Sequence, residues 1–220
     1  MDLKTQAIVL RRVDYGEADR ILDILTPEGK QSVIAKGARR EKSKMAGGIE
    51  LFSVSDVVVR RKREGGMGIL SSVRLKKYYG DVIVGDFEKI EFGYEVLRDM
   101  SKYSEGVEGG EYFDMLAQVL DGMGVMPLSV LRAWFRMNIL RVNGEGVNLW
   151  RDVESRKLEA SLRYDWDLGA GALRETTDGE IGADEIKMMR LLVSSRLSVA
   201  ARVREMEKIW DLVERITRVS

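Results

Sequence analysis

The first 80 residues alternate between short apolar runs and polar turns, the pattern of β-strands rather than of helices. In the run that follows residue 48, odd-numbered residues from Leu51 to Val59 share one face, and even-numbered residues from Phe52 to Val58 share the other. The pattern predicts no helix in this part and five strands, at 5–13, 19–26, 31–37, 49–61 and 69–77.

Five short strands in a domain of this size favour a small closed barrel, because closure removes the sheet edges that promote aggregation. An OB-fold is the first candidate. An SH3-like barrel or an open five-stranded sheet would give much the same pattern. One connection, between the third and fourth strands, is long and highly charged.

A helical period replaces the strand pattern from residue 86 onward. Phe87, Ile90, Tyr94, Leu97 and Met100 recur at spacings of three and four residues, as on one face of a helix. Helices are predicted at 86–103, 112–124, 127–144, 183–199 and 201–219.

Segment 145–182 has no clear helix and is too long for a plain loop in a compact domain. It therefore either contains small strands of its own or is an insertion. The predicted class is α+β and multidomain. An N-terminal five-stranded β-barrel (1–80) precedes an α-helical domain (81–220) that carries this irregular insert.

The composition narrows the chemistry, since the chain has no cysteine and no histidine. Disulfides, thiolate zinc sites, cysteine nucleophiles and imidazole bases are excluded together, which favours a binding protein without cofactor or metal over an enzyme. A carboxylate-dependent enzyme built on Asp14, Glu17 and Asp19 is the remaining catalytic alternative, although a turn with local ion pairs explains these residues better. Without a membrane-spanning run or a signal peptide, we expect a cytoplasmic protein.

The net charge of zero conceals two oppositely charged parts. Residues 1–80 hold 17 Lys and Arg against 10 Asp and Glu, a formal charge of +7, and the remaining residues hold 19 against 26, or −7. The bias peaks between Lys30 and Arg63, with ten basic and three acidic residues. Such a cluster indicates a polyanion partner, so we expect nucleic-acid binding that is mostly electrostatic.

The candidate contact residues are the cations in and around the long connection. Aromatic residues for base stacking are few in this half: Tyr15, Phe52, Tyr78 and Tyr79. An RNA-binding OB module of translation or RNA processing would share this basic patch. The predicted nucleic-acid contacts are Lys36, Arg39, Arg40, Lys42, Lys44, Arg61, Arg63 and Arg74.

A second candidate site lies in the helical half, where Arg132, Trp134 and Arg136 bring aromatic and cationic groups together. This mixture suits a short peptide with an apolar side chain and a carboxylate. A tryptophan on a helix is more often a core residue, and both interpretations stay open here.

Residues 7–59 resemble the N-terminal domain of the bacterial RecO recombination mediators. The resemblance rests on a strand ending in Arg-Arg, followed by "DYGEADRIL", "TPEGK" and "AKGARREKSKMAGGIELF" in that order. The helical half agrees in layout more than in sequence.

The resemblance implies an OB-fold followed by a helical domain, in a nucleoid-associated DNA-repair protein. Such proteins bind single- and double-stranded DNA and anneal complementary strands. They work with RecR, engage the acidic C-terminal tail of the single-strand-binding protein SSB, and help to load RecA. DNA contact lies on the basic face of the OB domain, which Lys36, Arg39, Arg40, Lys42 and Lys44 match here.

The sequence departs from the family at one point. Many members carry a four-cysteine zinc site in the irregular insert, and this chain has no cysteine to form it. We expect apolar packing to replace the metal, with Trp150 and Trp166 important for stability. The expected apolar cluster is Leu149, Trp150, Leu162, Tyr164, Trp166 and Leu173.

Overall fold

The computed structural model describes residues 2–61, 66–107 and 110–217. The chain divides into two compact units, Met1–Gly124 and Val125–Ser220, and each is described by itself. The change from strands to helices falls between Tyr78 and Gly80, so the three helices that follow the barrel cluster with it. A domain boundary at residue 80 stays a prediction.

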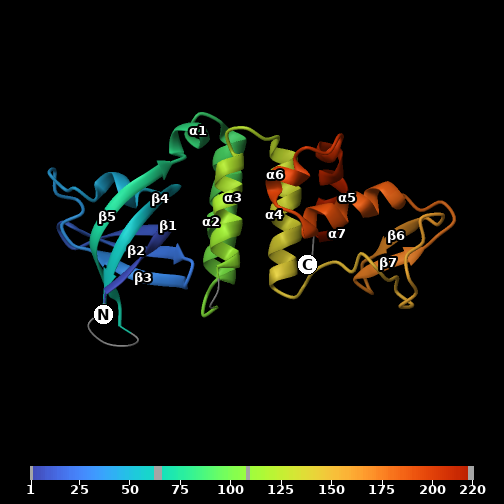
Figure 1. The fold of residues 1–220 in the computed structure, drawn as a ribbon, viewed down its shortest axis with the longest axis horizontal. Helices are drawn as coiled ribbons and strands as arrows, with labels where there is room; N and C mark the ends of the chain where they lie inside the picture. Colours follow the sequence, from blue (N-terminus) through green and yellow to red (C-terminus); the bar gives the residue numbers. More distant parts are fainter. Residues whose placement is uncertain (1, 62–65, 108–109, 218–220) are drawn as a thin grey trace. The chain divides into compact units, whose positions relative to one another are not determined.

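Five strands of the first unit form a closed barrel in the order β1-β2-β3-β5-β4 (Figure 1). Neighbouring strands are antiparallel except β3 and β5, which pair in parallel at Val33↔Gly68 and Ile34↔Ile69. This closed arrangement is that of an OB-fold and confirms the predicted α+β class with an N-terminal barrel. The strands are β1 (Asp2–Tyr15), β2 (Asp19–Thr26), β3 (Gly29–Ala35), β4 (Ser53–Arg60) and β5 (Gly68–Tyr78).

Alternating residues of these strands fill the barrel. In β4, Ser53, Ser55, Val57 and Val59 are buried, as the alternation predicts. The two serines keep their hydroxyls satisfied, because Ser53 donates to the Glu50 carbonyl at 2.6 Å and Ser55 to the Gly48 carbonyl at 2.8 Å. The buried apolar core consists of Ala7, Val9, Leu22, Ile24, Val33, Ala35, Ala38, Ile49, Val57, Val59 and Leu70.

The predicted start of the fourth strand was wrong. Ala46–Ile49 form a 3-10 helix, η1, and β4 begins only at Ser53. Phe52 has a φ of 63°, in the left-handed region, which turns its ring out of the strand alternation and onto the ring of Tyr94. The reason is tertiary, since the aromatic contact lies on a helix that follows β5.

Three helices complete the first unit: α1 (Gly80–Val84), α2 (Phe87–Tyr103) and α3 (Glu111–Gly122). The short α1 was not predicted. The Asp86 side chain caps α2 by accepting hydrogen bonds from the backbone of Glu88 and Lys89. α2 lies against β1, and Lys30 of β3 donates to the Ser101 carbonyl of α2 at 2.9 Å.

In the second unit three α-helices pack around α4 (Leu128–Val142): α5 (Ala183–Ser194), α6 (Leu197–Ala200) and α7 (Trp210–Thr217). The predicted helix 183–199 is interrupted because Ser195 is extended. The predicted helix 201–219 starts only with a 3-10 turn, η2 (Met206–Ile209), after a left-handed Glu205 that allows Met206 to be buried against α4. Its last residues, 218 and 219, lie outside the described ranges.

The insert has small strands of its own, which answers the question that its sequence left open. β6 (Tyr164–Asp167) and β7 (Ala172–Glu175) form an antiparallel hairpin, and Tyr164 also bridges to Ile181. Leu149, Tyr164 and Leu173 are buried as expected, and Leu162 and Trp166 are half-buried. Trp150 is 54% exposed, with its ring under the Arg190 guanidinium, so its expected core role was wrong.

Polar side chains hold the rest of the insert. Asp152 is buried and accepts hydrogen bonds from the backbone of Glu154 (2.9 Å) and Arg156 (2.8 Å) and from the Arg156 guanidinium (2.8 Å). Arg163 donates to the carbonyls of Gly179 and Glu180, and Arg190 to that of Leu149. Without cysteine or histidine, and with no group of three acidic side chains arranged for a metal in the described ranges, this chain does not fit the family's zinc site.

None of the helices that the structure describes combines the length and the apolar character needed to cross a bilayer.

The packing of the insert predicts unequal effects of two truncations. Leu173→Ala, at a fully buried position, should lower the free energy of unfolding by about 2–5 kcal/mol. Trp150→Ala removes an exposed ring and one cation–π contact, so it should cost about 0.5–1 kcal/mol. Urea unfolding followed by circular dichroism measures both variants. If Trp150→Ala lowered the free energy of unfolding as much as Leu173→Ala does, this result would contradict the assigned packing.

The hydrogen bonds to Asp152 predict a pH-dependent contribution to stability. Burial opposes the charged carboxylate, but hydrogen bonds from Arg156 and Glu154 outweigh it, and the pKa of Asp152 lies below its usual 3.8. The carboxylate of Asp152 therefore contributes its full stabilisation above pH 3.8, the usual pKa. This stabilisation is lost as the pH falls through the lower pKa that Asp152 has in the folded protein. Asp152→Asn should lower the melting temperature at pH 7, and the difference from the unmodified chain should shrink below pH 3.8.

The matched control is Asp178→Asn, an exposed aspartate of the same insert with no hydrogen bond among the residues described. Its melting temperature should follow that of the unmodified chain throughout the titration. If the melting temperature of Asp152→Asn stays below that of the unmodified chain by the same amount down to pH 2.5, lost packing and not the lost charge is responsible.

Candidate nucleic-acid interface

The basic connection between β3 and η1 is fixed to the barrel at both ends. At its start, the Gly37 backbone donates to Asp19 Oδ1 at 2.7 Å, and the Arg39 backbone donates to the Ala18 carbonyl at 2.9 Å. At its end, Ile49 is buried in the barrel core. The loop is therefore a shaped surface with defined ends.

This loop and β5 surround a groove of about 620 Å³. Four cations line it, Lys36, Arg40, Lys42 and Lys44, here called the basic tetrad; Ser71, Ser72 and Val73 of β5 also line it. No carboxylate lines the groove, and the tetrad side chains make no ion pair with any residue that the structure describes. The tetrad is thus a cluster of exposed positive charge available to an external anion.

Arg39 has a different role from its neighbours. Its guanidinium lies 3.3 Å from the Asp14 carboxylate, which also pairs with Arg20 at 3.1 Å. Arg20 in turn pairs with Glu50 at 3.3 Å, and Glu50 pairs with Arg12. This chain of alternating charges, the arginine–carboxylate chain, links β1, β2 and the loop, so Arg39 holds the loop in place.

The other predicted cations that the structure describes do not line the tetrad groove. Arg61 donates to Gln31 Oε1 at 3.0 Å, and Arg63 lies outside the described residues. Arg74 of β5 lies 2.5 Å from Asp56, and its hydrogen bond holds the pKa of that carboxyl below its usual value. The structure thus brings together four of the eight predicted contacts.

The second predicted site is largely internal to its unit. Trp134 is 3% exposed, and its indole donates to the Ser195 carbonyl at 3.1 Å, so it belongs to the core. Arg136 donates to the Thr217 carbonyl at 2.9 Å and links α4 to α7. Arg132 is half-buried on α4. The core interpretation that the sequence left open therefore describes Trp134.

Two of the three acidic residues of the catalytic alternative have structural partners, and the third, Glu17, is exposed with no ion pair to a described residue. Asp14 pairs with Arg20 and Arg39, and Asp19 accepts from the Gly37 backbone. These contacts position the basic loop, which supports the ion-pair interpretation over the catalytic one.

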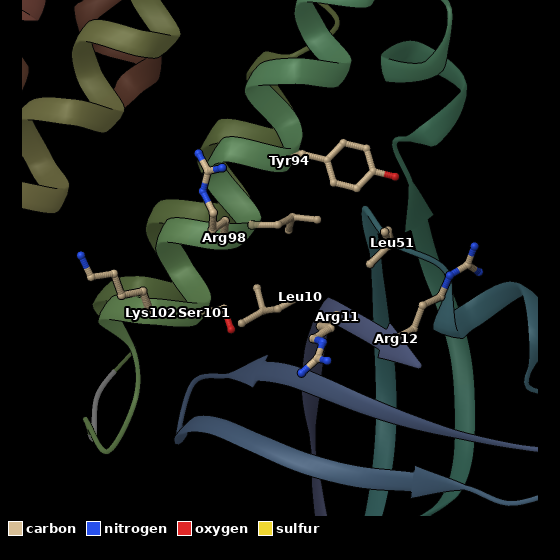
Figure 2. Close-up of a pocket in the computed structure, with 9 residues that line it drawn as sticks. Leu10, Arg11, Arg12, Leu51, Tyr94, Arg98, Ser101 and Lys102 are labelled. Carbon is tan, nitrogen blue, oxygen red and sulfur yellow. The ribbon is translucent and has the colours of Figure 1, made fainter. Parts of the chain in front are cut away.

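A second cavity, of about 460 Å³, lies between β1 and α2 (Figure 2). Its floor is apolar, and one aromatic side chain, Tyr94, borders it while remaining 54% exposed. Sequence analysis could not single out this position, because Tyr94 has the same helical spacing as Leu97 and Met100, which are buried.

The fold and the tetrad groove define an OB-fold protein with a basic groove that no described carboxylate lines. The family model for the recombination protein O N-terminal domain matches residues 1–79. The DNA repair protein RecO of Anaeromyxobacter sp. (strain K) is 33% identical over 191 residues, covering 82% of this chain and 68% of the relative. RecO of Dehalococcoides mccartyi (strain CBDB1) is 27% identical over 233 residues, covering 100% and 89%. The chain belongs to the RecO family of DNA repair proteins.

Proposed function

We propose that this protein is a non-enzymatic mediator of recombinational DNA repair that contacts DNA through the basic tetrad. The observation that carries the proposal is the tetrad groove, in which Lys36, Arg40, Lys42 and Lys44 surround a cavity that no described carboxylate lines. Membership in a family of DNA repair proteins makes DNA the polyanion of choice.

Electrostatics explains how such a groove would act. Each phosphate neutralised by Lys or Arg releases condensed counterions, which gives tight, salt-sensitive binding without base readout. Two complementary strands repel each other through their phosphates, and a basic surface that contacts both lowers this repulsion. Annealing of strands is thus the activity that the groove supports, on single- and double-stranded DNA alike.

The finer steps follow from the family. The protein would anneal strands covered by SSB, contact the acidic tail of SSB, and assist RecA loading together with RecR, on nucleoid DNA in the cytoplasm. The helical unit would supply partner contacts.

The basic tetrad predicts the salt dependence of DNA binding. A triple variant, Arg40→Gln, Lys42→Gln and Lys44→Gln, should bind single-stranded DNA more weakly. It should also reduce the slope of log affinity against log salt concentration by about 2.1, because about 0.7 is lost for each phosphate contact removed on a single strand. Fluorescence anisotropy across a salt titration measures both quantities.

The matched control replaces Lys157, Lys187 and Lys208 by Gln, which changes the net charge equally at exposed positions of the second unit. It should leave the slope within about 0.5 of the unmodified value. The melting temperatures should stay close, because none of the substituted side chains is buried. Equal slopes for the triple variant and the unmodified chain would remove the tetrad as the binding site.

A second experiment tests the repair role against RNA binding. The unmodified chain should accelerate the annealing of complementary DNA strands coated with SSB, and the tetrad variant should not. A structured RNA of equal length should compete no better than duplex DNA, since the groove contacts phosphates only. Tighter binding to the RNA together with no acceleration of annealing would favour an RNA-binding module instead.

A further inference from the structure

We propose that the cavity between β1 and α2 holds an unpaired base of single-stranded DNA, with the neighbouring phosphates on the cations at its rim. This inference rests on the proposed function and adds a second contact to it, one that duplex DNA does not make.

The cavity has an apolar floor within the first unit, made by Leu10, Leu51 and Leu97. Leu10 lies where the β1–β2 register shifts between Val9 and Arg11, so it has no partner on β2, and it is 5% exposed. Figure 2 shows its side chain and that of Leu51 bordering the space below Tyr94. The volume, about 460 Å³, falls in the range of sites that enclose small molecules or parts of larger ones.

One aromatic ring stands at this cavity in a supported position. Tyr94 and Phe52 pack edge-to-face, with centroids 5.6 Å apart and planes at 76°. Phe52 is itself buried and fixed by its left-handed backbone, while Tyr94 remains 54% exposed. A ring held on one side and open on the other is the platform on which unpaired bases stack in OB-fold proteins.

The rim of the cavity is positive. Arg98 of α2 makes no ion pair with the residues described, and the Lys102 ammonium lies 4.8 Å from the ring centroid of Tyr103. Arg11 of β1 is 69% exposed and pairs with Asp23 at 4.0 Å, and Arg12 also lines the cavity but is engaged by Glu50. An apolar floor, an open aromatic ring and a rim of cations together suit a ligand that is flat, apolar and anionic at its edge.

The arginine–carboxylate chain connects this cavity to the basic tetrad. Arg12 at one end lines the cavity, and Arg39 at the other end lies in the tetrad loop. The chain contains three arginines and two carboxylates, so the surface between the two sites does not repel a phosphate backbone. A single strand that leaves the tetrad can therefore continue to the cavity, whereas the bases of a duplex remain paired.

An acidic peptide with an apolar side chain would meet some of the same groups. The open face of Tyr94 and the continuity with the tetrad favour the nucleobase, because a peptide side chain would need only the aliphatic floor.

The test measures the binding of a single strand that carries one 2-aminopurine, a base whose fluorescence falls on stacking, and of a duplex of equal phosphate number. Tyr94→Ala should weaken single-strand binding about tenfold and abolish the fluorescence change, while duplex affinity stays within about twofold. Tyr94→Phe should retain both the single-strand affinity and the fluorescence change, because the aromatic ring remains. The matched control is Phe87→Ala, which removes an aromatic side chain 79% exposed on the same helix but outside the cavity.

Arg98→Gln provides a second variant, in case the loss of the Phe52 contact destabilises Tyr94→Ala. It should reduce the salt slope for the single strand by about 0.7 and leave that for the duplex unchanged. Unchanged single-strand binding by both variants, or an equal loss on duplex, would overturn the inference. If Tyr94→Ala instead weakens only the binding of a synthetic peptide with the acidic tail of SSB, and leaves DNA binding unchanged, the cavity is a peptide site.

The two proposals fail in different ways. If the tetrad variant still loses affinity for both forms of DNA while Tyr94→Ala and Arg98→Gln do not, only the base site is refuted. If no variant alters DNA binding, the proposed function is refuted as well.

Discussion

Closure of the barrel between β3 and β5 is the constraint on which the candidate interface depends. The pairing is short, at Val33↔Gly68 and Ile34↔Ile69, and it has room only because residue 68 is glycine: a Cβ there would lie 2.5 Å from Val59 Cγ1. Since β5 occupies the place beside β3, the chain must cross the end of the barrel to reach β4. Residues 36–52 make this crossing, and Ala38 and Ile49 fix it in the core. The topology thus holds an otherwise irregular, highly charged loop in a defined position.

The patterns that depend on neighbours in sequence were the predictable ones. Each of the five strands was located, and the alternation in β4 from Ser53 to Val59 matches the buried face. The failures have tertiary causes. Phe52 leaves the strand pattern because its ring packs on Tyr94, and the last predicted helix starts late because a left-handed Glu205 directs Met206 against α4. The hydrophobic periodicity within those segments cannot predict contacts with elements that are distant in the sequence.

The candidate site was predictable as a region but not as a set of residues. The clustering of Lys and Arg along the sequence predicts that eight cations form one basic region. It does not show which of these cations have carboxylate partners on other strands. Arg39 forms an ion pair with Asp14 of β1, and Arg74 forms one with Asp56 of β4. Both guanidinium groups therefore already have a partner within the protein. The tetrad differs because the crossing loop holds its side chains beside the serines and Val73 of β5, where no acidic residue of the described ranges lines the groove. Tyr94 was missed for a related reason, because exposure on a helix depends on what covers it.

A chain without net charge can still present a strong positive field to DNA, because salt limits the range of charge interactions. At physiological ionic strength the screening length is about 8 Å. Carboxylates more distant than this from the tetrad therefore do little to weaken its attraction for phosphate, even though the chain as a whole is neutral. What decides the field in the groove is the set of carboxylates close to it. Glu41 of the same loop is exposed but does not line the groove, and Asp14 of β1 is paired with Arg20 and Arg39. The ion pairs that hold the loop in place thus also neutralise the charge of Asp14.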